Sequence, residues 1–267
     1  MFNTVERIIS LRNLKPKKKE GFLKVISIFS FLGIMLGVSI LIIVMSVMNG
    51  FRTELTNKIL GFNPHITVSP YSSKIDPSFK ILLEKKYNKF KIKETFNGEG
   101  IVMKNDFTKG VLIKGINFTK SNEYKHIQDK LIDGNFKDFK EGSIIIGKEL
   151  AINLDVVAGD RLNIMSSKFI TTPLGGFPKQ ENFKISGIFS SGFYEFDQNV
   201  VFLNLRDSLS FFEKTVNDIS LEIFLEEPLK ADFFKKEIEI INENYFIYSW
   251  SDLNKSFFSA LKIERNV

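Results

Sequence analysis

The side chains that could perform catalytic chemistry are few and scattered. The 267-residue sequence has no cysteine and only two histidines, His65 and His126, which lie far apart along the chain. A protein metal site needs several such ligands at short spacing, so no metal site is expected, and His65 is expected to be structural or solvated. The GxxxxGK[ST] pattern for ATP is absent, and GIFSSG (187–192) lacks the GxSxG spacing of a nucleophile elbow. The sequence therefore predicts a chain that is not an enzyme and needs no cofactor.

The segment ITTPLGGFPKQ (170–180) is suited to binding rather than to catalysis. Two prolines and two glycines stand within residues 173–178, between two strand-like runs. This composition is typical of an exposed hairpin loop. Leu174 and Phe177 are nevertheless large apolar residues at what should be the solvated tip. Apolar groups in such a place often mark a contact site, so an ordinary loop and a partner-binding loop are both open readings.

A membrane anchor precedes these residues. No charged side chain occurs from Val25 to Phe51, whereas a bilayer needs about 20 apolar helical residues. A cleavable signal peptide would have an apolar core of only about 7–15 residues and a small-residue cleavage site, and neither is seen. Gly33 and Gly37 form a small-xxx-small pattern that permits close helix packing in lipid. We therefore expect a transmembrane helix over residues 25–51.

The helix is predicted to continue beyond the anchor. Phe51, Leu55, Ile59 and Phe62 recur at spacings of four, four and three, which is one helical stripe. Asn49-Gly50 is the strongest turn signal in this part, and Pro64 comes shortly after the stripe. The pattern predicts a stalk helix over residues 52–64, about three turns long.

The charge distribution predicts the orientation. Residues 1–24 contain two acidic side chains and seven basic ones, Arg7, Arg12, Lys15, Lys17, Lys18, Lys19 and Lys24, for a net +5. Because the whole chain carries +6, the part after the N-terminal segment is almost neutral. The positive-inside rule places the N-terminal segment in the cytoplasm and the part after Phe51 outside. Nucleic-acid binding is not expected, because it requires a basic patch on the folded domain.

The outer part is predicted to be a mixed α+β domain. The runs that are typical of strands are 100–104, 110–116, 143–147, 181–189, 199–205 and 218–225, and VAGDRLNIM (157–165) places Gly159-Asp160 before another strand. The runs that are typical of helices are 77–87, 148–154, 228–241 and 251–263. We expect mostly antiparallel pairing in an α+β fold.

Two of these helices carry specific expectations. Asp76-Pro77 is a start signal, with a cap followed by proline at the first helical position, and Leu82, Leu83 and Tyr87 offer a buried side. Ser251 is the expected cap of the last helix.

Four segments resemble one family of membrane proteins, in order along the chain. VISIFSFLGIMLGVSILIIVMSVMNGFRTELTNKILGFNPHI (25–66) resembles the first membrane helix and stalk of the lipoprotein-releasing permeases of the LolC/LolE type. IIIGKELAINLDVVAGDRLNIMS (144–166) resembles the outer-domain core shared with the wider MacB-like transporter superfamily. TTPLGGFPKQENFKISGIF (171–189) is similar to the LolC side, where a Pro-bounded hook projects. YSWSDLNKSFFSALKIERNV (248–267) resembles the segment that leads to the second membrane helix.

The resemblance implies a domain order. It implies a cytoplasmic segment (1–24), a membrane helix (25–51), a stalk (52–64), a periplasmic MacB-like domain (65–250) with its hook loop (170–180), and a return helix (251–267). Such permeases have four membrane helices, whereas one is found here, so the sequence is expected to be an N-terminal part of a longer permease.

The resemblance also implies a function. Permeases of this type are subunits of an ABC transporter in the bacterial inner membrane that extracts lipoproteins from its outer leaflet and passes them to a periplasmic chaperone. The implied partners are a LolD-like cytoplasmic ATPase, a second permease subunit or a second copy of this chain, a LolA-like chaperone, lipoprotein substrates and membrane lipid. The alternatives are a single-pass anchored binding or sensor protein, and a mechanotransmission subunit of the MacB or FtsX kind.

The site residues follow from the same resemblance. The residues implied to line the lipoprotein-binding cavity are Leu41, Val44, Met48 and Phe51. The residues implied to form the chaperone-binding hook are Pro173, Leu174, Gly175, Gly176, Phe177, Pro178, Lys179 and Gln180, with Phe177 as the apolar plug. Glu181 departs from the family pattern, because a basic residue is expected there.

Overall fold

The fold is that of a computed structural model, which describes residues 4–13, 21–71, 74–104, 107–172, 175–242 and 244–255. The chain forms two compact units, Met1–Thr56 and Asn57–Val267. In the N-terminal part, α1 covers Thr4–Asn13 and α2 covers Gly21–Phe62. The predicted continuation of the helix past Asn49-Gly50 is confirmed, since α2 has no break there. Its segment Val25–Phe51 has a mean hydropathy of 2.7 and is long and apolar enough to cross a membrane.

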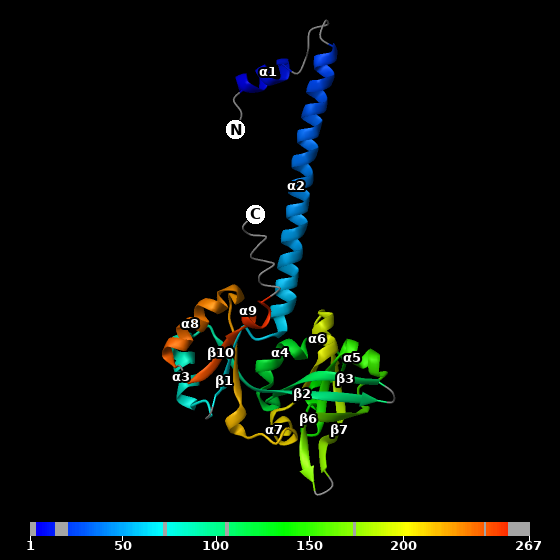
Figure 1. The fold of residues 1–267 in the computed structure, drawn as a ribbon, viewed down its shortest axis with the longest axis vertical. Helices are drawn as coiled ribbons and strands as arrows, with labels where there is room; N and C mark the ends of the chain where they lie inside the picture. Colours follow the sequence, from blue (N-terminus) through cyan, green and yellow to red (C-terminus); the bar gives the residue numbers. More distant parts are fainter. Residues whose placement is uncertain are drawn as a thin grey trace. The chain divides into compact units, whose positions relative to one another are not determined.

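The strands of the second unit form one hydrogen-bonded sheet (Figure 1). They are β1 (Ile66–Pro70), β2 (Lys91–Lys104), β3 (Phe107–Ile116), β4 (Leu131–Gly134), β5 (Ser143–Gly147), β6 (Arg161–Thr172), β7 (Gly175–Phe189), β8 (Val200–Asn204), β9 (Ser220–Phe224) and β10 (Tyr245–Ser249). The α-helices among them are α3 (Pro77–Lys86), α4 (Lys125–Gln128), α5 (Lys148–Leu154), α6 (Tyr194–Asn199), α7 (Leu205–Phe211), α8 (Ala231–Ile241) and α9 (Trp250–Leu253).

Four strands and two helices build the first lobe. The strand order is β10-β1-β9-β2, and α3 connects β1 to β2 while α8 connects β9 to β10. This is the split βαβ arrangement of ferredoxin-like folds. The core of this lobe lies between the sheet and the helices, where Leu83 and Ile238 pack with Ile66, Ile223 and Trp250.

Six strands close into a barrel that forms the second lobe. Strand β2 pairs with β3, and the pairing continues through β8, β5, β7 and β6 back to β2. Closure removes the exposed strand edges that would otherwise invite association. The barrel interior is apolar and includes Val102, Ile113, Ile146, Leu162 and Ile185. The β3–β8 and β5–β7 pairs are parallel, and the other strand pairs in the described sheet are antiparallel, so the pairing is mostly antiparallel as expected.

The 14-residue strand β2 joins the lobes. Its first part, Lys91–Thr95, pairs with β9, and its second part pairs with β3 and β6. The last turn of α2 packs against both lobes, because Leu60 belongs to the first core and Phe62 lies 6.0 Å from Phe189 by ring centroid.

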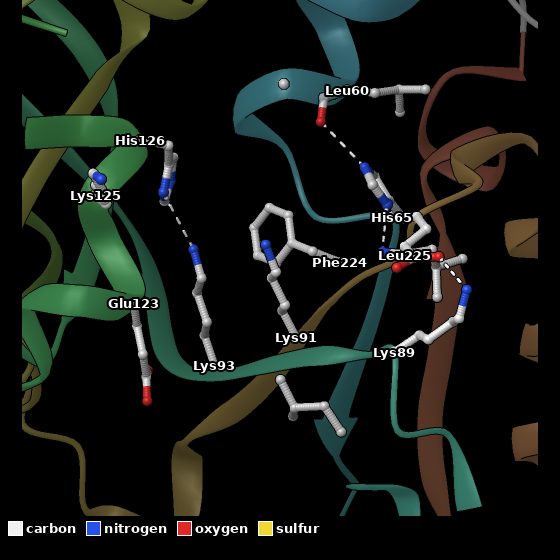
Figure 2. Close-up of a pocket in the computed structure, with 13 residues that line it drawn as sticks. Leu60, His65, Lys89, Lys91, Lys93, Glu123, Lys125, His126, Phe224 and Leu225 are labelled. Carbon is white, nitrogen blue, oxygen red and sulfur yellow. Dashed lines mark hydrogen bonds and ion pairs between the residues drawn. The ribbon is translucent and has the colours of Figure 1, made fainter. Parts of the chain in front are cut away.

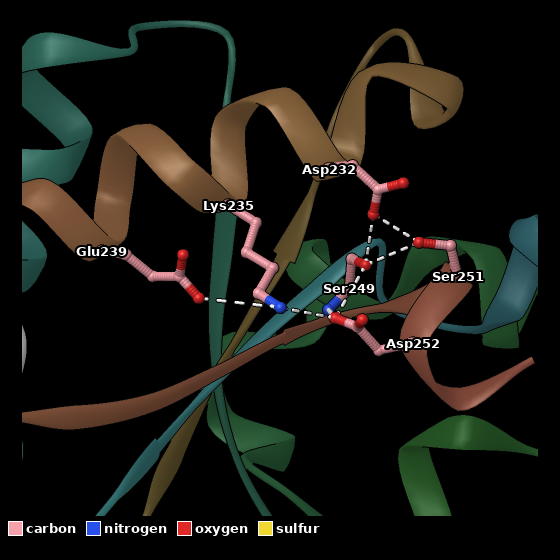
Figure 3. A network of polar contacts seen from close by, with 6 residues as sticks. All are labelled: Asp232, Lys235, Glu239, Ser249, Ser251 and Asp252. Carbon is pink, nitrogen blue, oxygen red and sulfur yellow. Dashed lines mark hydrogen bonds and ion pairs between the residues drawn. The ribbon is translucent and has the colours of Figure 1, made fainter. Parts of the chain in front are cut away.

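A polar network fixes the end of β10 and α9 against α8. In it, the Ser249 hydroxyl donates to Asp232 at 2.6 Å, and Lys235 lies 2.8 Å from Asp252. The residues drawn in Figure 3 are Asp232, Lys235, Glu239, Ser249, Ser251 and Asp252.

Three expectations about local structure were wrong. The cap of α9 is Ser249 rather than Ser251, because the Asp252 carboxylate accepts from the Ser249 N–H at 2.9 Å while Ser251 bonds Asp232. Leu82 is exposed, and Phe79 instead joins Leu83 on the buried side of α3. The predicted loop over residues 170–180 is mostly strand, since β6 extends to residue 172 and β7 begins at residue 175.

Candidate functional site

The hairpin of β6 and β7 projects beyond the body of its lobe (Figure 1). Strand β6 also pairs with β2, but only over Asn163–Ser166. Nearer the tip, Ile170 pairs with Phe177 and the two strands have no third strand beside them in the described part of the sheet. A shift of register between Met165 and Phe169 marks a bulge, which increases the local twist where the hairpin leaves the barrel.

The tip of the hairpin presents the aromatic ring of Phe177. Gly175, the first residue of β7, has a φ of +119°, a conformation that residues with a Cβ rarely adopt and that glycine permits. Phe177 follows and is 52% exposed. Pro178 has no N–H to donate to a neighbouring strand, which suits a strand that has a partner on one side only. Pro173 and Leu174, which the sequence placed at the tip, lie outside the described residues.

The polar residues next to this ring are engaged within the domain. The Lys179 ammonium donates to the Ser210 carbonyl at 2.9 Å and lies 3.1 Å from the Glu181 carboxylate. The Gln180 amide lies 3.6 Å from the Met165 sulfur on the opposite strand. Glu181, the departure from the family pattern, is therefore the ion-pair partner of Lys179. Among the described side chains near the tip, Phe177 is exposed and Lys179 is held within the domain.

The base of the hairpin is anchored in the barrel core. Leu162 and Ile164 from β6 and Phe183 and Ile185 from β7 are all buried. The Phe183 ring meets the Phe211 ring edge to face at 5.8 Å. The base of the hairpin is therefore part of the packed barrel core.

The residues predicted to contact lipoprotein lie on one face of α2. Leu41, Val44, Met48 and Phe51 are 44–59% exposed. Their spacing of three, four and three places them along one stripe of the helix.

A pocket in the second unit was not predicted from the sequence. It lies between the last turn of α2, the start of β2, the 3-10 helix η1 (Phe118–Tyr124) with α4, and β9 (Figure 2). Its polar lining consists of His65, Lys89, Lys91, Lys93, Glu123, Lys125, His126 and Glu226. The alternating lysines of KFKIK (89–93) were a visible signal, because alternate residues of a strand face the same side.

The two histidines have structural contacts in this pocket. The Leu225 N–H donates to His65 Nδ1 at 2.7 Å, so Nε2 carries the proton and donates to the Leu60 carbonyl at 3.1 Å. Burial lowers the pKa of His65. His126 Nδ1 lies 3.4 Å from the Lys93 ammonium, and burial, followed by the charge of Lys93, lowers the pKa of His126 to about 3. Both imidazoles are neutral at pH 7.

Comparisons with known proteins identify the family. The model of the MacB-like periplasmic core domain matches residues 27–239. The lipoprotein-releasing system transmembrane protein LolC of Buchnera aphidicola (from Acyrthosiphon pisum) is 31% identical over 100% of this chain and 67% of its own length. The chain belongs to the LolC-like part of the MacB family.

Two further proteins are similar to this chain. LolC of Xylella fastidiosa is 29% identical over 100% of this chain and 65% of its own length. The crystal structure of the periplasmic region of MacB from Actinobacillus actinomycetemcomitans is similar at 12% identity, with a TM-score of 0.43 over 76% of this chain and 95% of that one. The LolC-like chain thus spans about two thirds of the length of the curated relatives it matches.

The family match includes all three regions described above. Residues 27–239 contain the face of α2, the β6–β7 hairpin and the lysine-lined pocket. The prediction of a LolC-like permease with one apolar N-terminal helix and an α+β domain is confirmed.

Proposed function

We propose that this chain is part of the membrane subunit of an ABC transporter that releases lipoproteins from the bacterial inner membrane. The relatives that support this role are LolC proteins of lipoprotein-releasing systems. ATP would be hydrolysed by a separate LolD-like cytoplasmic ATPase, and the subunit would work with a second permease or a second copy of itself. By the positive-inside rule, residues 1–24 are cytoplasmic and the second unit is periplasmic.

The exposed ring of Phe177 carries the assignment of the chaperone contact. A large apolar side chain at the end of a projecting, well-anchored hairpin is suited to insert into an apolar groove. The neighbouring Lys179 is already held by Ser210 and Glu181, so the contact would depend mainly on apolar burial. We assign residues 173–180 as the hook for a LolA-like periplasmic chaperone.

The exposed face of α2 would receive the acyl chains. Each CH₂ withdrawn from lipid costs about 0.8 kcal/mol, so an extracted lipid anchor needs an apolar surface as well as ATP-driven work. Leu41, Val44, Met48 and Phe51 provide such a face on the apolar segment.

The hook is tested by binding. The full chain in detergent is titrated with a LolA-like chaperone by calorimetry, as wild type and as Phe177→Glu. The variant is expected to lose at least tenfold in affinity, because it would bury a charge in an apolar groove. Phe233→Glu is the matched control, since Phe233 on α8 is 58% exposed and Phe177 is 52% exposed. Equal binding by wild type and Phe177→Glu would remove the hook assignment.

The acyl-chain face is tested by crosslinking. A photoreactive residue at Met48 or Val44, in the full chain co-expressed with a triacylated lipoprotein, is expected to form adducts with it. The same probe at Lys148, an exposed position on α5, is expected to form none. Adducts of equal yield at all positions would contradict the proposal.

A further inference from the structure

The lysine-lined pocket has an excess of positive charge. Its cavity is about 640 Å³ in volume, and its lining contains four lysines and two glutamates, with Leu60, Ile92, Phe224 and Leu225 among the apolar residues. One pair is internally neutral, because Lys89 lies 2.8 Å from Glu226. Neither Lys91 nor Lys125 forms an ion pair with any residue that the structure describes.

The excess extends into the protein interior. Lys93 and Lys114 are only 6% and 5% exposed, and Glu222 is the one buried glutamate on the neighbouring strand β9. Glu222 lies 2.8 Å from the Lys114 ammonium and also accepts from the Asn97 amide at 3.5 Å. Two buried lysines therefore share one buried carboxylate, and Lys114 holds it.

Lys93 is left with weak contacts. Its ammonium lies 3.4 Å from His126 Nδ1 and 4.3 Å from the centre of the Phe224 ring. Figure 2 shows the Lys93 amine and the Glu123 carboxylate pointing in opposite directions. A buried ammonium that lacks a close carboxylate is costly, and an anion in the adjoining cavity would remove that cost.

The arrangement of the cations fits a phosphate group. Lys91 and Lys93 project from the same face of β2, and Lys125, at the start of α4 next to His126, lines another wall of the cavity (Figure 2). Amines from two sides can each reach a different oxygen of a tetrahedral anion, and lysine is a common phosphate ligand. Burial lowers the pKa of Lys93 to about 8, so its cationic form still predominates at pH 7.

We propose that this pocket binds a phosphate group, with Lys93 as its buried anchor and Lys91 and Lys125 as the outer ligands. A free phosphate ion and the headgroup of an anionic phospholipid share this chemistry. Leu60, which lines the pocket, follows Phe51, the last residue of the apolar segment, by nine residues. The experiment below therefore tests both a phospholipid headgroup and a free phosphate ion.

The test uses the full chain in phosphate-free neutral detergent at pH 7 and constant ionic strength. One arm titrates inorganic phosphate by calorimetry. The other measures retention of phosphatidylglycerol by native mass spectrometry, with diacylglycerol as the lipid without phosphate. The variants are Lys93→Met, Lys91→Gln and Lys125→Gln, and Lys148→Gln is the matched exposed control on α5.

The expected result is a loss of about tenfold or more for Lys93→Met and about threefold for each outer lysine, with no change for Lys148→Gln. If only phosphatidylglycerol retention depends on Lys93, the ligand is a phospholipid headgroup. If the binding of inorganic phosphate depends on Lys93, the ligand is a free anion. Binding that is absent in wild type, unchanged in Lys93→Met, or equally weakened in Lys148→Gln would overturn the proposal. Should Lys93→Met fail to fold, the two exposed outer variants decide by the same criterion.

Discussion

The β6–β7 hairpin and the lysine-lined pocket differ in whether their key lysine has an ion-pair partner. On the hairpin, Lys179 is held by the Ser210 carbonyl and the Glu181 carboxylate, while the apolar Phe177 is exposed. In the pocket, Lys93 is buried without a close carboxylate. Exposing one apolar ring at a solvated tip lowers stability little, and the ring remains accessible to a partner. A buried cation without a close carboxylate lowers stability more, and a bound anion would reduce that loss.

The largest expected effect comes from removing the buried carboxylate. Glu222→Gln would leave Lys114 and Lys93 as two buried cations with no buried carboxylate beside them, so we expect the free energy of unfolding to fall by about 3–5 kcal/mol. Urea denaturation in detergent can be followed by the fluorescence of Trp250, the single tryptophan, which is 3% exposed. A loss below about 1 kcal/mol would contradict the buried-pair description of the pocket.

The second largest effect is expected from acid, which should lower the free energy of unfolding through His126. His126 takes up a proton near pH 3 in the folded chain, whereas the unfolded chain takes it up near pH 6.5. Between these values the unfolded state binds more protons, so stability falls as the pH falls, by about 1.4 kcal/mol per pH unit. The loss from this residue would be about 2–3 kcal/mol by pH 4.5. Denaturation midpoints at several pH values should show a smaller slope for His126→Gln, and equal slopes would refute the assignment.

A local effect is expected at the hairpin tip. Gly175→Ala would place a Cβ at a φ of +119°, which costs about 1–3 kcal/mol. Because the tip is remote from the barrel core, we expect the loss to appear as faster amide exchange over residues 161–189. Gly110→Ala is the control, since a Cβ there meets no atom within 4 Å and φ is ordinary. Unchanged exchange in the hairpin would mean that the turn does not require glycine.

The smallest effect is expected from the hairpin ion pair. Glu181→Gln removes the partner of Lys179 at a position that is 39% exposed by side chain, so the free energy of unfolding should change by about 0–1 kcal/mol. The loss of stability in Glu222→Gln is expected to be much larger, and this difference directly compares the buried ion pair with the solvated one. Similar losses in both variants would show that the hairpin pair is not solvated.

Local sequence signals predicted some elements closely. The runs SIIIG and KELAINL correspond to β5 (Ser143–Gly147) and α5 (Lys148–Leu154), and Asp76-Pro77 begins α3, where the Asp76 carboxylate accepts from the Ser78 N–H at 2.9 Å. These elements depend on contacts between near neighbours, which the sequence contains.

Other elements depend on distant strands. Residues 91–99 at the start of β2 have few apolar side chains and were not predicted as a strand, yet β9 and β3 pair with them on either side. β1 and β10 were also missed, although they pair with each other over five residues. Hydrogen bonds to strands far along the chain stabilise these segments, and periodicity within one segment does not reveal them.

The sequence by itself determined the long apolar helix, the α+β character of the second unit and the exposed apolar Phe177 of the hairpin, because these follow from composition and from short-range pattern. The family followed from the resemblance of four segments to known permeases. Only the tertiary structure decided that Lys179 is internally paired, that the barrel closes through β6, and that Lys91, Lys93 and Lys125 meet around one cavity. In the sequence these lysines resemble any solvated face. The fold brings them to one cavity and buries Lys93 there, while Lys91 and Lys125 stay exposed at its edge. Burial is what makes the charge of Lys93 costly when no carboxylate is close.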